Sequence, residues 1–131
     1  MYSTNSPNNS ILVKKTLVIG ASPKPERYSN KAVRKLRQYG HPVVAIAKRA
    51  AMIDDTHIVT GFPELSDIDT VTLYVGQEHQ DEYFNYILSL HPRRLIFNPG
   101  TENPELENLA KQNGIEAIEA CTLVLLSIGE Y

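Results

Sequence analysis

Residues 15–28 read KTLVIG, then ASPKPER, then Tyr, and this stretch decides the expected fold. The apolar run at 16–20 predicts a short strand that ends in glycine, and a helix is expected to begin near Ser29. The turn between them is rich in Ser and Pro and carries Lys24 and Arg27. A strand, a glycine turn and a helix in this order present backbone N–H groups to a phosphate at the helix N-terminus. The stretch therefore predicts an α/β sheet with a phosphate site at the end of its first strand.

The rest of the chain continues this alternation of strands and helices. Apolar runs predict buried strands at 42–47, 70–75, 94–98 and 115–119, with a weaker edge strand at 57–60. Amphipathic spacing predicts helices at 29–39, 78–90 and 104–113, and a final apolar helical segment at 121–127. Alternating short strands and helices are typical of parallel sheets. We expect a Rossmann-like three-layer α/β sandwich with six strands in the order 3-2-1-4-5-6, and a ligand cleft where strands 1 and 4 diverge.

Two of these helices carry recognisable end signals. The helix at 29–39 is expected to begin with a Ser29 hydroxyl cap and to end at Gly40. Its predicted buried stripe is Ala32, Val33, Leu36 and Tyr39. For the helix at 104–113, Asn103 is the expected N-cap, with proline at the first helical position.

Length and composition restrict the class of protein. The 131 residues are expected to form one domain at 14–131, preceded by a polar, disordered tail at 1–13. A formal net charge of −2 argues against a general nucleic-acid binder. A lone cysteine, Cys121, suits a reducing compartment, and neither a membrane span nor a signal peptide is evident, so we expect a cytoplasmic protein. The histidines lack metal-ligand spacing and no catalytic motif stands out, so no metal and no enzymatic activity are expected.

The predicted second strand ends in Lys48 and Arg49. A fold that binds NAD typically places an acidic residue near this point to bind the ribose 2′-hydroxyl. A basic pair suits a phosphorylated ribose instead, as in NADP or coenzyme A, although an ordinary solvated loop is the alternative. The glycine fingerprint of dinucleotide folds is also incomplete, because Ser22 and Pro23 stand where further glycines are expected. This favours a phosphate held partly by side chains, with a plain strand-to-helix turn as the alternative.

The run VIGASPKPERYSNKAVRKLRQYGHPVVAIAKR at 18–49 resembles small stand-alone CoA-binding-domain proteins, which are related to the N-terminal domain of the succinyl-CoA synthetase α subunit. The later blocks GFPEL, DTVTLYVG, RRLIFNPGTENPELENLAKQNGI and EAC fit the same family in the same order. The resemblance implies a Rossmann-like fold and coenzyme A as the ligand. The turn is poorer in glycine than in the synthetase, and no equivalent of the synthetase's other domains follows, so ligase activity is not expected.

The resemblance also implies a set of ligand-binding residues. The phosphates would be held by Gly20, Ala21, Ser22, Arg27, Tyr28 and Ser29. The adenosine end and its 3′-phosphate would lie near Ala47, Lys48 and Arg49. The pantetheine path would be lined by Val75, Gly76, Asn98 and Pro99, with the thiol end near Cys121. A mixed disulfide between Cys121 and the coenzyme A thiol is one hypothesis, and a buried, inert cysteine is the alternative.

Three functions stay open on the sequence alone. The leading hypothesis is non-catalytic binding of coenzyme A or an acyl-CoA, a small-molecule ligand, with neither nucleic acid nor membrane as a partner. The second is an NADP-binding reductase fragment or partner, which the basic pair would suit. The third is a protein-interaction module, in which the apolar tail LVLLSIGEY at 123–131 contacts a second copy or another protein.

Overall fold

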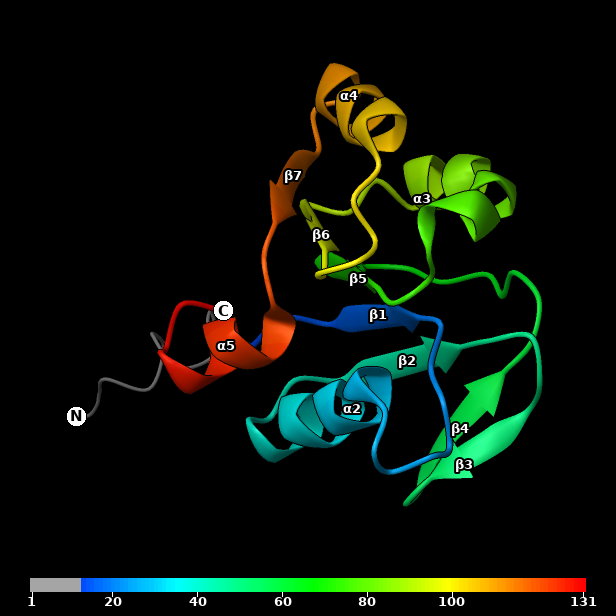
Figure 1. The fold of residues 1–131 in the computed structure, drawn as a ribbon, viewed down its shortest axis with the longest axis vertical. Helices are drawn as coiled ribbons and strands as arrows, with labels where there is room; N and C mark the ends of the chain where they lie inside the picture. The colour runs from blue at the N-terminus through cyan, green and yellow to red at the C-terminus, as the bar shows by residue number, and fades with distance from the viewer. Residues whose placement is uncertain (1–12) are drawn as a thin grey trace.

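The computed structural model describes residues 13–131, and a seven-stranded sheet forms its centre (Figure 1). The predicted tail therefore lies, up to residue 12, outside the described residues. In spatial order the strands are β3 (Ala51–Ile53), β4 (Thr56–Val59), β2 (Val43–Ile46), β1 (Thr16–Ile19), β5 (Thr70–Leu73), β6 (Arg94–Phe97) and β7 (Glu116–Glu119). Neighbouring strands are parallel except β3 and β4. The mainly parallel α/β sheet is confirmed.

The predicted order 3-2-1-4-5-6 describes the six parallel strands, but it lacks the antiparallel edge strand β3. This strand forms a tight hairpin with β4, in which Ile53 pairs with Thr56. Asp54 makes the turn with a positive φ of 50°, which Asp tolerates better than most residues. The strand is only three residues long and begins with Ala and Met, so it lacks the β-branched run that marks the other strands.

Helices cover both faces of the sheet, which gives the expected three layers (Figure 1). On one face α2 (Tyr28–Gln38) and α5 (Thr122–Ser127) pack on the sheet, and their buried residues join a cluster of Val18, Val33, Leu36, Ala45, Ile96, Leu126 and Tyr131. On the other face lie α3 (Phe84–Leu90) and α4 (Pro104–Gln112), in a cluster with Leu17, Ile19, Val71, Ile87, Leu95, Phe97, Leu106 and Ala110. The strands β1, β5 and β6 are buried along their whole length because helices cover them on both sides.

The start of α2 differs from the prediction. The helix begins at Tyr28, and Arg27 occupies the cap position without a side-chain cap bond. Ser29 lies inside the first turn and is buried, so it does not cap the helix. Ala32, Val33 and Leu36 are buried as predicted, but Tyr39 sits at the C-cap and is half exposed.

The helix predicted at 78–90 is shorter than expected. Two 3-10 turns, η1 (Gln77–His79) and η2 (Asp81–Tyr83), precede α3. The predicted cap of α4 is confirmed, because the Asn103 side-chain oxygen accepts a hydrogen bond of 3.2 Å from the Leu106 N–H. Within residues 13–131 none of the helices is both long and apolar enough to cross a bilayer.

Candidate binding cleft

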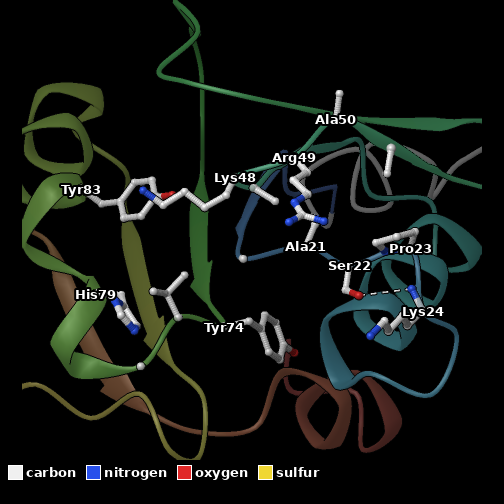
Figure 2. A pocket seen from close by; sticks show the side chains of 15 residues that line it. Ala21, Ser22, Pro23, Lys24, Lys48, Arg49, Ala50, Tyr74, His79 and Tyr83 are labelled. Atoms are coloured by element: carbon white, nitrogen blue, oxygen red, sulfur yellow. Dashed lines mark hydrogen bonds between the residues drawn. The ribbon is translucent and has the colours of Figure 1, made fainter.

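A cleft of about 700 Å³ opens at the carboxyl ends of β1, β2 and β5 (Figure 2). Three loops line it, together with two side chains from the 3-10 turns: Gly20, Ala21, Ser22, Pro23, Lys24, Ala47, Lys48, Arg49, Ala50, Ala51, Tyr74, Val75, Gly76, His79 and Tyr83. The strands β1 and β5 are neighbours whose connections run to opposite sides of the sheet. Ligands of open α/β sheets bind at such a switch point, so the cleft lies where the sequence predicts it.

The first strand enters the cleft through a turn at Gly20. Its φ of +94° is a conformation that residues with a Cβ rarely adopt. A Cβ added there would lie 2.8 Å from the carbonyl oxygen of Tyr74, the residue directly after β5. The N–H groups of Gly20 and Ala21 donate to the carbonyl oxygen of Ile46, over 2.9 and 3.1 Å. These two residues therefore shape the turn, while their own N–H groups are engaged within the protein.

The rest of this turn is closed by its own hydrogen bonds. The backbone N–H of Lys24 donates to the Ser22 hydroxyl over 3.1 Å, as Figure 2 shows. The Asn30 side chain donates to the Ser22 carbonyl oxygen over 2.9 Å, and this bond ties the turn to the first turn of α2. The turn thus holds Ser22 and Lys24 at the edge of the cleft.

Two lysines and one arginine line the cleft, and they differ in their partners. Lys48 donates to both carboxylate oxygens of Glu82, over 2.6 and 2.5 Å. This hydrogen bond, with the charge of the carboxylate, raises the pKa of Lys48. The side chains of Arg49 and Lys24 have no ion pair or hydrogen bond with any of residues 13–131. In Figure 2 Lys48 extends toward Tyr83, whereas Arg49 points toward Ala21. The cleft therefore has two uncommitted cations and one that is paired.

Two tyrosines contribute to the wall formed by β5 and the 3-10 turns. Tyr83 is buried beneath Lys48, whose ammonium lies 6.0 Å from the centre of its ring. Its other neighbour is Phe62, with ring centres 5.6 Å apart. Burial, followed by the charge of Glu82, raises the pKa of Tyr83. Burial also raises the pKa of Tyr74, so both phenols stay protonated at neutral pH.

The structure brings only part of the predicted set to this cleft. Gly20, Ala21, Ser22, Ala47, Lys48, Arg49, Val75 and Gly76 line it. Six other predicted residues do not: Arg27, Tyr28, Ser29, Asn98, Pro99 and Cys121. Cys121 is partly exposed and occupies the cap position of α5. The roles assigned to these residues stay predictions.

Asn98 has a well-defined structural environment. It is 2% exposed, and its amide donates to the Thr72 hydroxyl over 2.6 Å and to the Leu73 carbonyl oxygen over 2.8 Å. Its side-chain oxygen accepts a hydrogen bond of 2.9 Å from the N–H of Thr122. Asn98 therefore joins β5, the end of β6 and the start of α5.

Gln80 also joins separate segments through buried side-chain hydrogen bonds, between the loop after β5 and the start of α4. The sequence analysis did not identify it. It is completely buried, and its amide donates to the carbonyl oxygens of Val75 and Thr101 over 2.8 and 2.7 Å. Its side-chain oxygen accepts a bond of 2.9 Å from Asn103. Gln80 thereby fixes the segment that carries His79, Glu82 and Tyr83. No sequence signal marked it, because a glutamine within the polar segment EHQDE at 78–82 is typical of an exposed helix face.

Among the described residues no group of three or more His, Cys, Asp or Glu side chains is arranged to hold a metal ion. The polar and charged side chains that line the cleft are those of Ser22, Lys24, Lys48, Arg49, Tyr74, His79 and Tyr83.

A family model described as "CoA binding domain" matches residues 14–127. Among solved structures, an uncharacterized protein is 44% identical with a TM-score of 0.89, and the match covers 91% of this chain and 98% of that one. Prb, a protein redesigned for binding, is 21% identical with a TM-score of 0.81, covering 91% of this chain and 86% of its own. A hypothetical protein from Pyrococcus horikoshii OT3 is 23% identical with a TM-score of 0.78, and 95% of each chain is covered. The last two show the fold alone. None of the curated proteins matches the chain.

Proposed function

The chain belongs to the CoA-binding-domain family, and we propose that it binds coenzyme A or an acyl-CoA, without catalysis, in the cleft described above. The observation that carries this proposal is the pair of uncommitted cations, Lys24 and Arg49, on either side of the turn at Ser22. Coenzyme A contains a diphosphate and a 3′-phosphate, and guanidinium groups bind phosphate through paired, charge-assisted hydrogen bonds. The donor set of the cleft therefore fits this ligand.

The size and position of the cleft support the same ligand class. A volume of about 700 Å³ lies within the range of roughly 300–1,000 Å³ that is usual for pockets of organic ligands. The cleft follows the strands β1, β2 and β5, as nucleotide sites in open α/β sheets do. In the proposed complex Arg49 binds a phosphate beside Ser22, and the apolar residues Val75 and Ala47 contact the less polar part of the ligand.

The shifted pKa values in the cleft favour binding over proton transfer. A general acid or base works best with a pKa near the operating pH. The pKa of Lys48 is raised by its bond to Glu82, and burial raises those of Tyr74 and Tyr83. All three pKa values move away from neutrality. These three groups are therefore poorly matched to proton exchange with a ligand at neutral pH.

Calorimetric titration with coenzyme A, dephospho-CoA and NADP tests the proposal. We expect coenzyme A to bind. Arg49→Ala should lower the affinity for coenzyme A about tenfold through loss of a charged hydrogen bond. Lys111→Ala is the matched control, because it removes the same charge from the surface of α4, where Lys111 pairs with Glu107. Equal affinities for the two variants would contradict the role of Arg49.

The other ligands separate the alternatives. A preference for NADP over coenzyme A would favour the reductase partner, since Arg49 can also bind a ribose 2′-phosphate. If neither nucleotide binds, the interaction module is left, and sedimentation should then show a concentration-dependent oligomer. Val124 and Ile128, which are more than half exposed on and after α5, are the residues to alter in that case.

A further inference from the structure

The Lys48–Glu82 ion pair connects two walls of the cleft. Lys48 belongs to the loop after β2, whereas Glu82 lies on η2, 34 positions further along the chain. Both carboxylate oxygens accept from the same ammonium group, and the two side chains are 69% and 44% exposed. The pair is therefore open to solvent, and it lies beside the cleft, because Lys48 and Tyr83, the residue after Glu82, both line it.

This arrangement neutralises one cation of an otherwise basic cleft. Lys48 lines the cleft, but its charge is already balanced by a carboxylate within hydrogen-bonding distance. A ligand phosphate that binds Lys48 competes with Glu82 for this ammonium group. An anion that does not displace Glu82 gains less from Lys48, because it also meets the negative charge of the carboxylate.

We propose that Glu82 determines ligand specificity as an internal competitor for Lys48. The inference rests on the proposed function, because it assigns a role within the same cleft. In the free protein the Glu82 carboxylate accepts hydrogen bonds from the Lys48 ammonium group. A phosphate monoester, with nearly two negative charges at neutral pH, displaces the singly charged carboxylate, whereas a ligand without such a group leaves the pair closed.

The surroundings of Glu82 favour a movement of the side chain over a movement of the segment. Gln80 fixes the backbone of the 3-10 turns through its bonds to Val75 and Thr101. Tyr83 is buried next to Glu82 and anchors the same turn. The carboxylate itself is exposed, so it can rotate into water when a phosphate takes Lys48.

The variants Glu82→Gln and Glu78→Gln test this role. Both remove one negative charge from the same segment, but Glu78 is exposed and its nearest basic partner is His79, at 3.8 Å. We expect Glu82→Gln to bind coenzyme A about 2- to 5-fold more tightly in low salt, the range for release of an exposed ion pair. Dephospho-CoA should change by less than about 1.5-fold, and 0.5 M salt should reduce the gain. Glu78→Gln should change neither ligand.

A double-mutant cycle isolates the pair. In the Lys48→Ala background Glu82→Gln should no longer alter the affinity for coenzyme A, because the ammonium group for which Glu82 and the ligand compete is absent. A gain that persists in that background, or an equal gain from Glu78→Gln, would overturn the proposal. Either result would show that the gain in affinity comes from a less negative surface in general and not from the Lys48–Glu82 pair.

Inorganic pyrophosphate serves as a second probe, because its binding does not depend on the identity of the natural ligand. Tighter pyrophosphate binding by Glu82→Gln without any coenzyme A binding would retain the competition and remove the coenzyme A assignment. Coenzyme A binding that is equal in wild type and Glu82→Gln would do the reverse. If no variant binds either probe, both proposals are overturned.

Discussion

Gly20→Ala tests the physical reason for the turn that opens the cleft. Gly20 has a φ of +94°, and the added methyl group would meet the Tyr74 carbonyl oxygen at 2.8 Å and a Val75 methyl group at 2.8 Å. The first of these contacts is with the backbone directly after β5, which is held in place because the Tyr74 N–H donates to the Ile19 carbonyl oxygen over 2.8 Å. The substitution therefore combines backbone strain with a steric clash.

The two contributions can be estimated separately. A left-handed conformation costs a residue with a Cβ about 1–2 kcal/mol. Overpacking in a close-packed region adds typically about 1–3 kcal/mol. We therefore expect Gly20→Ala to lower the free energy of unfolding by about 2–5 kcal/mol. That is a large part of the stability of a domain of this size, which is about 5–15 kcal/mol.

Gly100→Ala is the control that separates strain from clash. Gly100 has a nearly identical φ of +91°, but nothing lies within 4 Å of its added Cβ. It should lose only the conformational part, about 1–2 kcal/mol. Urea denaturation followed by far-UV circular dichroism measures both variants, and with a slope of about 2 kcal/mol/M the midpoints should differ by about 0.5–1.5 M. Equal midpoints would show that the close approach to β5 has no energetic weight and would refute the reasoning.

Two further predictions concern groups away from the turn. Asn98→Ala leaves the buried N–H of Thr122 without its acceptor, so the free energy of unfolding should fall by about 2–4 kcal/mol in urea, whereas the exposed Asn108→Ala should change it by less than about 0.5. Similar losses for both variants would contradict the structural role of Asn98. Partial burial is the largest single influence on the pKa of Asp69 and raises it, but the hydrogen bonds from Arg93 and Thr70 and the charges of Arg93 and Arg94 together outweigh it, so the net pKa is lowered. The ionised form of Asp69 therefore stabilises the fold above about pH 4, and this contribution is lost as the pH falls through the folded-state pKa. Asp69→Asn should flatten the acid limb of a stability–pH curve measured by urea denaturation, and an unchanged limb would contradict this linkage.

The sheet could be predicted from the sequence because its central strands are buried on both faces. Such strands are rich in apolar and β-branched residues, as in the segments that form β1, β5 and β6, and no alternation of polar and apolar residues is needed to recognise them. The edge hairpin was harder. β3 has three residues without a β-branched start, and only the Asp54–Asp55 pair marks its turn. Local propensity is a weak guide where a strand is short and half exposed.

The cleft residues that directly follow a strand could be predicted from the sequence. Once the strand order is known, the residues after β1, β2 and β5 must lie at one edge, and these are the predicted residues that do line the cleft. The position of the first residues of α2 outside the cleft was not predictable in this way. Pro23 and Pro25 lengthen the turn beyond a glycine fingerprint, so Tyr28 and Ser29 lie outside the lining.

Pairings between distant residues were beyond sequence reasoning altogether. Lys48 and Glu82 are 34 positions apart, and each alone is typical of a solvated surface. Gln80 reaches Thr101, 21 positions away, and its burial contradicts the amphipathic reading of its segment. These contacts depend on the position of the 3-10 turns in the fold, and no local sequence pattern predicts that position.

The two buried amides explain why side-chain charge can decide what the cleft accepts. Asn98 joins β5 to the start of α5, and Gln80 joins the loop after β5 to the loop before α4. Breaking either set would leave buried backbone groups unpaired, at a cost of about 1–3 kcal/mol for each group. Moving the backbone around the cleft thus costs more free energy than breaking an exposed ion pair. A ligand that enters will rearrange Lys48, Glu82 and Arg49 before it rearranges the loops, so discrimination between anions is expected to reside in these three charges.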